Sequence, residues 1–426
     1  MKKILSVGTC VACLNRAAMP QATGINVAQD KDSKEVTVSY TLTEAAIVTF
    51  SLETNGVALA RSDYASARGD AMCVGRKLEA GMYTMKWKPY EDWPNAGKDI
   101  PLEAKVKVWA TNNPPEWIVA NLAAENDVTY YESAEDIPGG VTDAVYKNTK
   151  LVLRRIHAAG VPWEMGSPSN ENGRDSSREA LREVVLTNDF YIGIYELTQG
   201  QVAAITGSRP YSTYGGASLD NEWQPYPVGS YNSGVLANLF SYEYLRGTNA
   251  TEGISWPETG HRVGENSLLA KFRARTGLEL DLPVEAQWEF AARGGCVTGL
   301  YDGNNITNTT FDANLDRLGW FYNNSLNAYG GRTTWPVGLK EPNAYGLYDM
   351  LGNLSDMCAD WYNPAAGCDP NVGHSSPSIA NCRNRRGGSA VWDYGCNTVR
   401  VNYRDATGAS AGRLDIGCRL AITLCY

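Results

Sequence analysis

The sequence is poor in histidine, in long apolar runs and in positive charge. Its only histidines are His157, His261 and His374, and no two are close in sequence, which excludes a zinc site of the His-Glu-x-x-His type. No apolar run approaches the roughly 20 residues of a membrane-spanning helix, so we expect no transmembrane segment. The 47 acidic and 38 basic residues give a net charge of -9, which argues against a nucleic-acid-binding protein.

The residues that are abundant predict a turn-rich chain of two or three domains. The 426 residues include 24 Tyr and 12 Trp but only 7 Phe, together with 42 Gly and 19 Pro. Tyr and Trp suit surfaces that are half buried and half wet. Most of the 10 Cys are interpreted as small buried hydrophobes, and a disulfide between Cys368 and Cys382 is the alternative for that pair.

Residues 1–21 resemble a short secretory leader. Lys2 and Lys3 precede an apolar stretch over residues 4–14. This pattern predicts a secreted, periplasmic or cell-surface protein. The alternative is a cytoplasmic protein with a frayed N-terminus.

The following segment, residues 22–122, is predicted to be an all-β module. Apolar and polar residues alternate over 35–40 and 105–110, and turn residues recur about every ten positions. This pattern is typical of a small immunoglobulin-like β-sandwich. Residues 123–149 are acidic and contain Pro and Gly, so we interpret them as a linker.

From residue 150 to 426 the predicted strands are short, the loops are long, and helices are expected over 266–276 and 283–293. On the second helix, Trp288 is expected to be buried and Glu285 to face neighbouring backbone donors. Six sequence motifs follow one another here: WEMGSP (163–168), FYIGIYELTQ (190–199), LPVEAQWEFAARGG (282–295), NAYGLYDMLGN (343–353), RGGS (386–389) and IGCR (416–419).

In order and spacing, these motifs strongly resemble the formylglycine-generating enzyme family, also called the sulfatase-modifying factor family. The resemblance implies a C-type-lectin-like α+β fold with much irregular structure. The whole chain is therefore predicted to be an immunoglobulin-like sandwich (22–122) followed by this domain (150–426).

The resemblance also implies a calcium loop over residues 349–356. Asp349 and Asp356 would supply carboxylates, and Gly352 and Leu354 would supply carbonyl oxygens, which are the ligands that calcium prefers. Asp356 stands where the family usually has Glu. A metal-free, hydrogen-bonded turn is the alternative. A second calcium site would involve Asn314, with Leu315, on a weaker match.

The chain departs from the family where the enzymes bind copper. The family oxidises a sulfatase Cys with molecular oxygen and holds copper between two Cys, three and eight residues after the Ser that matches Ser389. Here those positions are Trp392 and Asn397, and Cys396 is one residue out of register. One thiolate alone would bind Cu(I) poorly. If the chain is an enzyme nonetheless, Cys396 and Ser389 are the expected catalytic residues.

The family's Gly-Asn-Val-Trp-Glu-Trp motif is also changed, and both of its Trp are lost over residues 352–357. In the helix motif, Asp281 and Val284 stand where Arg and Thr are usual.

The stretch 390–415 contains no Lys, Glu, Gln or Met and mixes Tyr, Asp, Asn, Arg, Ser and Gly. This composition is typical of adaptable recognition surfaces. It resembles the variable region of diversity-generating retroelement target proteins, which share the fold; an ordinary surface loop is the alternative. The residues expected to contact a ligand are Trp392, Asp393, Tyr394, Asn397, Asn402 and Tyr403.

The sequence thus favours an exported bacterial protein that binds a protein, peptide or glycan ligand, with calcium as a structural ion. A copper- and oxygen-dependent oxidase that converts a sulfatase Cys to formylglycine is the alternative function.

Overall fold

The computed structural model describes residues 20–59, 64, 66–68, 77–92, 101–111, 113–125, 127–208, 241–247, 263–327, 330–363, 382–391, 395–413 and 415–424. Most of the expected leader therefore lies outside the described residues. The chain divides into two compact units, with the main boundary between Pro114 and Pro115. Each unit is described by itself.

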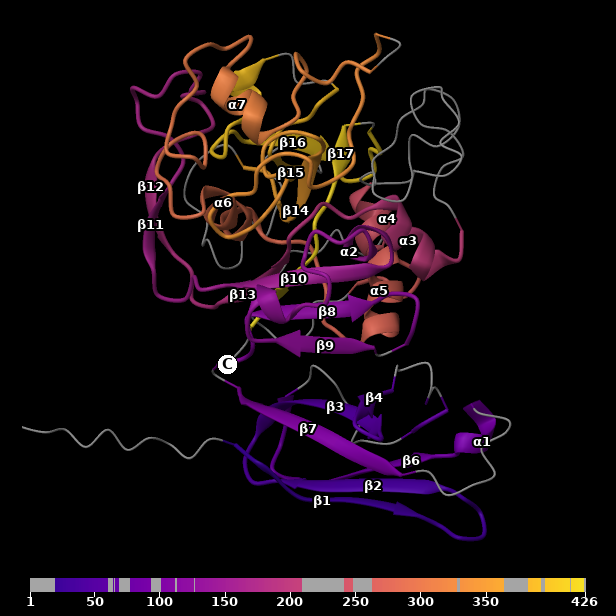
Figure 1. Ribbon diagram of the computed structural model, residues 1–426. Coiled ribbons are helices and arrows are strands. Elements are labelled where there is room, and N and C mark those ends of the chain that lie inside the picture. Colours follow the sequence, from indigo (N-terminus) through magenta and orange to yellow (C-terminus); the bar gives the residue numbers. More distant parts are fainter. Residues whose placement is uncertain are drawn as a thin grey trace, which may run out of the picture. The chain divides into compact units, whose positions relative to one another are not determined.

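The first unit contains two antiparallel sheets (Figure 1). One sheet has the order β1 (Ala22–Gln29), β2 (Val36–Leu42), β6 (Gly81–Trp87). In the other, β3 (Ala46–Thr54) pairs with β4 (Val57–Ala58), β5 (Lys77–Leu78) and β7 (Leu102–Ala110). A short helix, α1, spans Pro89–Asp92.

Alternation along the sequence produces these strands. Val36, Val38, Tyr40 and Leu42 are all buried in β2, because side chains two residues apart lie on the same face of a strand. The predicted strands of this region are thus confirmed. Its immunoglobulin-like class stays a prediction.

The second unit begins earlier than the sequence pattern indicated. The strand β8 (Trp117–Asn121) pairs with β9 (Val128–Tyr131) and β10 (Lys150–Ile156), so it belongs to the sheet of the second unit. The segment expected to be a linker contains β9, the 3₁₀ helix η3 (Ala134–Asp136) and the helix α2 (Val145–Asn148). The acidic and turn-forming residues of this segment lie in and between these short elements, so the prediction of a linker was wrong.

The main sheet of the second unit has the order β18-β13-β10-β8-β9 and is antiparallel throughout. Its strand β13 (Phe190–Gly193) is fully buried and pairs with the C-terminal strand β18 (Ala421–Thr423). A hairpin of β11 (Pro162–Met165) and β12 (Arg182–Val185) lies between β10 and β13 in sequence.

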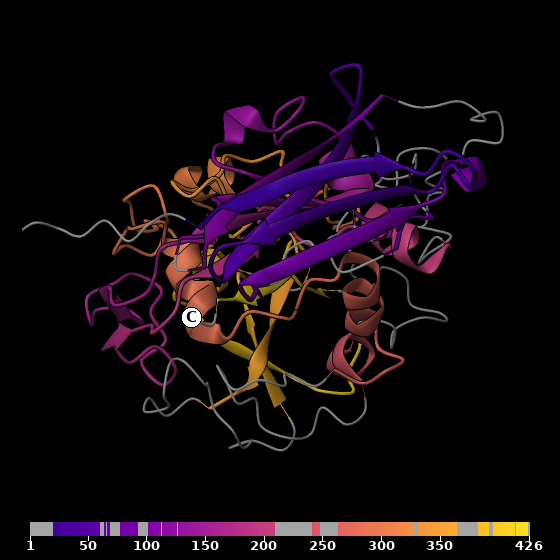
Figure 2. The same cartoon turned by 90° about the horizontal axis from the view of Figure 1, so that it is seen from below.

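The second unit also contains a smaller sheet of four strands. Its order is β16 (Asp405–Gly408), β15 (Cys382–Arg386), β14 (Ser355–Trp361), β17 (Ile416–Gly417), and only the β14–β17 pair is parallel. Every residue of β14 is buried. Figures 1 and 2 show the strands of this sheet among the orange and yellow segments of the chain.

The helices of this unit are short. They are α3 (Gln199–Thr206), α4 (Tyr242–Arg246), α5 (Leu268–Thr276), α6 (Glu285–Arg293) and α7 (Ala313–Leu318), with the 3₁₀ helix η4 at Cys396–Val399. The two predicted helices are confirmed as α5 and α6. Helix α6 begins just after Pro283 and ends at Gly294, whose φ of +57° suits a residue without a Cβ.

The described residues thus form a mixed α and β structure that consists mostly of sheet and irregular segments, as expected. Trp288 of α6 is fully buried in the core of the second unit, again as expected. Among the described residues no helix is long and apolar enough to cross a membrane. The C-type-lectin type of the fold remains what the family resemblance implies.

Candidate functional site

The candidate site is the segment that runs from the end of β15 to the start of β16, because the expected copper and ligand residues lie there. It opens with a sharp turn at Gly387 and Gly388, whose φ angles are +87° and +70°. A Cβ on Gly388 would lie 2.4 Å from the carbonyl oxygen of Thr398, so a larger residue would clash with the returning chain. The turn delivers Ser389 into a fully buried position.

Arg386 fixes the first end of this segment. Its fully buried guanidinium pairs with the carboxylate of Glu289 on α6. It also donates to the carbonyl oxygens of Tyr403, at 2.7 Å, and Val401, at 3.0 Å. One side chain therefore ties the start of the segment to its end and to the motif helix.

Arg400 fixes the second end. Its guanidinium pairs with Glu171 and Glu179, and all three side chains are fully buried. The Nδ2 of Asn402 donates to the two carboxylate oxygens of Glu171 at 2.7 and 2.8 Å. Asn402 is 0% exposed, so the expectation that it contacts a ligand is wrong in this structure: its amide completes an internal ion-pair network.

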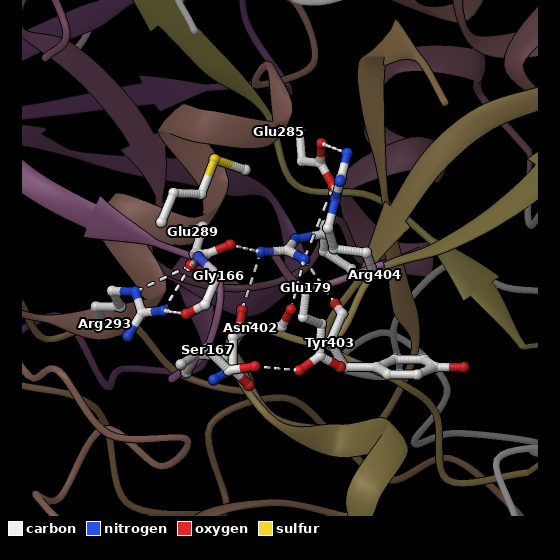
Figure 3. A network of polar contacts seen from close by, with 12 residues as sticks. Gly166, Ser167, Glu179, Glu285, Glu289, Arg293, Asn402, Tyr403 and Arg404 are labelled. Carbon is white, nitrogen blue, oxygen red and sulfur yellow. Dashed lines mark hydrogen bonds and ion pairs between the residues drawn. The ribbon is translucent and has the colours of Figure 1, made fainter. Parts of the chain in front are cut away.

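Arg404 completes the network (Figure 3). It makes a two-pronged ion pair with Glu285, with distances of 2.7 Å from Nε and 2.6 Å from Nη2. Burial opposes ionisation of Glu285, but the charges of Arg404 and Arg386 outweigh it and lower the pKa of the carboxyl. Glu285 was expected to accept from backbone donors; it accepts from a guanidinium instead.

The charges of this network balance. Its four carboxylates are matched by four guanidinium groups, and these residues are Glu171, Glu179, Glu285, Glu289, Arg293, Arg386, Arg400 and Arg404. Removing water from charged groups is costly unless each group is paired. We therefore interpret the network as an internal scaffold that holds both ends of the segment, with no carboxylate left over for proton transfer.

The remaining expected ligand contacts are Trp392, Asp393, Tyr394, Asn397 and Tyr403. Trp392, Asp393 and Tyr394 are outside the described residues. Asn397 is partly buried and its carbonyl oxygen accepts from Nε of Arg400 at 3.0 Å. Tyr403 is partly buried, and its backbone accepts from Arg386.

Cys396 does not look like a reactive thiol. It is fully buried, and its backbone N–H donates to the carbonyl oxygen of Thr309 at 2.7 Å. Burial, with a smaller contribution from Asp312, raises the pKa of the thiol to about 11. The thiolate is the form that binds Cu(I) and attacks substrates. The residues that the structure describes here therefore do not fit a two-thiolate copper site.

The expected calcium loop forms a tight turn. Asp349 and Asn353 both have positive φ, at +54° and +60°. Asp349 is buried, and its Oδ2 accepts from the backbone N–H of Gly338 at 2.7 Å. Asp356 accepts through Oδ2 from Nε1 of Trp288, at 2.8 Å, and from Nε of Arg419, at 2.6 Å. The Oδ1 atoms of both Asp are buried and have no hydrogen-bond partner.

Glu196 adds a third buried carboxyl that sequence reasoning missed. It accepts from the backbone N–H of Leu354 at 2.8 Å and from Nδ2 of Asn353 at 2.7 Å. Burial raises its pKa well above the usual value, and the charges of Asp349 and Asp356 raise it further. Its place in the FYIGIYELTQ motif was visible in the sequence, but nothing in the sequence showed that it meets the calcium loop.

The unpartnered oxygens of the loop are compatible with a cation, but the number of acidic side chains is small. Asp349 and Asp356 each offer a buried oxygen that nothing in the protein satisfies, which is how a binding loop for a hard cation is built. Within the described residues, no group of three or more His, Cys, Asp or Glu side chains is arranged to hold a metal. A cation here would therefore rely on two carboxylates and on backbone oxygens such as those of Gly352 and Leu354.

The weaker calcium position, Asn314, lies in the first turn of α7. Its backbone N–H donates to Oδ1 of Asp312 at 3.0 Å, and so does that of Leu315 at 3.1 Å. Asp312 thereby caps the helix. This local role accounts for the geometry, and a calcium ligand at Asn314 stays a prediction.

Comparison with known proteins identifies the family to which the chain belongs. The family profile of the sulfatase-modifying factor enzyme 1-like domain matches residues 154–424. A formylglycine-generating enzyme of Streptomyces coelicolor is 34% identical over 143 residues, which cover 32% of this chain and 45% of that protein. The mouse protein named inactive C-alpha-formylglycine-generating enzyme 2 is 39% identical over 235 residues, covering 49% of this chain and 70% of that protein.

Among solved structures, Treponema denticola variable protein 1 is similar with 22% sequence identity and a TM-score of 0.45, covering 64% of this chain and 95% of that chain. The chain spans about half the length of the bacterial formylglycine-generating enzymes that it matches.

Proposed function

The chain belongs to the sulfatase-modifying factor enzyme 1-like family, and we propose that it is a binding protein of that family. Its ligand would contact the surface around residues 390–397, together with Tyr403. The observation that carries this proposal is the anchoring of the segment at both ends by buried arginines, Arg386 before it and Arg400 after it.

This anchoring is what a recognition surface needs. Binding residues are best placed on loops that a rigid scaffold positions, because less conformational freedom is then lost on binding. Between the anchors, Trp392 and Tyr394 would supply rigid apolar area with polar tips, and Asp393 would supply hydrogen-bond acceptors. Asn397 and Tyr403 would border them.

The residues that stand at the family's two copper-binding positions support binding over oxidation. Trp392 and Asn397 replace the two family Cys, and the thiol of Cys396 has a raised pKa of about 11.

The calcium loop is proposed to be structural: bound between Asp349 and Asp356, the ion would neutralise their charges and stiffen the chain next to β14.

We further propose that residues 390–415 tolerate programmed variation, on the strength of their composition alone. Fewer positions are then free to vary, because Arg400, Asn402 and Arg404 are buried in the network. Variation would then be confined to positions such as 392–394, 397 and 403. Sequences of this locus from many isolates would show changes there and constancy at the buried positions.

The test of the proposal uses the whole chain, reduced and supplied with Cu(I) and calcium. Metal content is measured by elemental analysis, and the same sample is assayed with oxygen and a sulfatase-derived Cys peptide. We expect less than stoichiometric copper and no formylglycine. Stoichiometric copper with turnover that disappears in Cys396→Ser would overturn the proposal in favour of the oxidase.

A further inference from the structure

The hairpin of β11 and β12 has one face that packs into the core of the second unit and one face that is open to solvent. Met165 and Val184 belong to the core, whereas Glu164, Glu183 and Val185 are exposed. The alternation arises because successive side chains of a strand point to opposite faces. Figure 1 shows the hairpin at the left margin of the second unit.

The hairpin is held firmly in its place. The N–H of Gly166, directly after β11, donates to Oε1 of Glu289 at 2.8 Å, and its carbonyl oxygen accepts from Nη2 of Arg293 at 2.6 Å. The N–H of Ser167 donates to the carbonyl oxygen of Glu179 at 3.1 Å. A surface that is fixed in this way loses little conformational freedom when a partner binds to it.

The solvent-facing side of the hairpin, which we call the outer face, is apolar at both ends. Leu181 and Val185 flank Glu183 at spacings of two residues and are 41% and 39% exposed. Pro162, which lies opposite Val185, is also exposed. Val161, just before β11, is 41% exposed. Single exposed apolar residues are ordinary, but several on one hairpin are typical of an interaction surface.

The centre of the outer face carries two carboxylates that face each other. Glu164 and Glu183 are directly opposite across the two strands, which places their Cβ atoms about 5 Å apart. Like charges in this arrangement destabilise a sheet. Within the described part of the chain, neither carboxylate has an ion pair or a hydrogen bond.

The first unit shows how the chain meets the same arrangement elsewhere. Glu53 of β3 and Glu103 of β7 are also directly opposite each other. Nζ of Lys105 lies 3.8 Å from Oε2 of Glu53 and 3.0 Å from Oε2 of Glu103, so one cation serves both carboxylates. The pair on the outer face has no such cation among the described residues, and a partner would have to supply it.

We propose that the outer face is a docking surface for a protein partner whose contacting segment has an arginine or lysine with apolar residues two positions away on either side. The basic side chain would lie between Glu164 and Glu183, because its several N–H donors can serve two carboxylates at once. The apolar side chains would cover Leu181 and Val185. The proposal does not depend on the proposed function, since it concerns a different surface from that around residues 390–397.

The charge and composition of the outer face disfavour other occupants. A second copy of the chain packed on the same face would bring like carboxylates together, which costs free energy. Nucleic acids and anionic membranes would be repelled for the same reason. An aromatic ring that could stack on a sugar is missing from the residues of the outer face, which are Pro162, Glu164, Leu181, Glu183 and Val185.

The experiment pans a display library of random short peptides against the immobilised full chain. The library is first depleted on the double variant Glu164→Gln/Glu183→Gln, which removes peptides that bind elsewhere on the chain. We expect the peptides that remain to be enriched in Arg or Lys with apolar residues two positions away.

The selected peptides are then synthesised, and their Kd is measured for the original chain and for three variants. We expect Glu164→Gln/Glu183→Gln to weaken binding by about tenfold or more. Leu181→Ser should weaken it by about threefold or more, because less apolar area is buried. The matched control is Glu53→Gln/Glu103→Gln, which removes two charges from the pair that Lys105 already serves and should have little effect.

Thermal melts separate a binding role of the carboxylates from a structural one. Glu164→Gln/Glu183→Gln should melt no lower than the original chain, because it removes two opposed like charges. A lower melting temperature together with unchanged peptide binding would show that the pair serves the fold, and the proposal would be wrong.

Three further results would overturn the proposal. The first is a selection without basic peptides. The second is an equal loss of binding in the control, which would show that peptides respond only to the overall negative charge. The third is self-association of the Glu164→Gln/Glu183→Gln variant when no peptide binds the original chain, because the carboxylates would then protect an exposed hairpin from aggregation. Peptides that bind around residues 390–397 are removed in the depletion step, so these results leave the proposed function untouched.

Discussion

Two buried acidic regions lie in the second unit, and they differ in how their charges are met. In the arginine network around Arg386, Arg400 and Arg404, every carboxylate has a guanidinium partner. In the loop cluster of Glu196, Asp349 and Asp356, Arg419 pairs with Asp356 and the charge of Lys147 acts on Asp349, but two carboxylate oxygens have no hydrogen-bond partner. The first region is complete within the chain. In the second, we propose that a cation from outside completes the balance.

The comparison shows that the number of acidic residues in a region does not by itself predict a binding site. What distinguishes the two regions is whether the charge and the lone pairs are satisfied internally. By this criterion we propose that the loop cluster binds calcium, and we interpret the network as structural, although both lie close to family motifs. The predictions below test this difference, beginning with the largest expected effect.

The largest effect is expected for Arg400→Met. This change leaves Glu171 and Glu179 buried without a cation, so we expect a loss of about 3–5 kcal/mol in the free energy of unfolding. Urea denaturation of the full chain measures it. The matched control is Arg317→Met, which removes an exposed guanidinium and should cost less than about 1 kcal/mol. Equal losses in the two variants would show that the network is not an anchor.

The second prediction concerns the loop cluster. Calcium at about 100 times its Kd should stabilise the protein by roughly 3 kcal/mol, because it binds only the folded state. Asp349→Asn should abolish this calcium-dependent gain, while Arg317→Met should retain it. Thermal melts with calcium, with magnesium and with a chelator measure the effect. Melts that do not respond to calcium would indicate a metal-free turn.

The third prediction contrasts two asparagines that look equivalent in the sequence. Asn402→Ala removes the donor to both oxygens of Glu171 and should cost about 2–3 kcal/mol. Asn397→Ala should cost no more than about 0.5 kcal/mol, because that side chain makes no such bond in the described structure. Both values come from the same urea titration. A costly Asn397→Ala would mean that the middle of the segment is also structural.

The last prediction concerns a pH dependence at the edge of the network. Asp360 accepts from the backbone N–H of Glu285 at 2.8 Å and from Asn384 at 3.0 Å, but burial raises its pKa from 3.8 to about 7, and the charge of Glu285 adds to this. The folded state therefore binds its proton more tightly than the unfolded state. Stability from this group is present below pH 3.8 and is lost as the pH rises to about 7.

We expect Asp360→Asn to remove this decline in the free energy of unfolding between those pH values. Urea titrations at several pH values provide the measurement. An unchanged pH profile in the variant would show that Asp360 ionises normally.

The sequence predicted the elements better than it predicted the contacts. The helices α5 and α6 follow from apolar spacing, Pro283 and Gly294, and β2 follows from the alternation of Val36 and Val38. These signals are local. The family motifs, likewise, were found where the profile matches.

Which residues of the stretch 390–415 are buried could not be predicted, because burial there depends on ion-pair partners far away in the chain. Asn402 was expected to contact a ligand, yet its partner Glu171 lies in a distant part of the sequence. Asp281, which departs from the family pattern, pairs with Arg246 of α4, which is also distant in the sequence. A buried arginine has no sequence signature until its carboxylate is known.

The most direct test of the account is the tolerance of the segment to substitution. All amino acids are introduced singly at positions 386, 392, 393, 394, 400 and 404 of the full chain, and the folded fraction of each variant is read as resistance to protease. We predict that the three arginine positions tolerate almost nothing and that 392–394 tolerate almost everything. Intolerance at 392–394 equal to that at the arginines would contradict the claim that an anchored scaffold carries a freely variable binding surface.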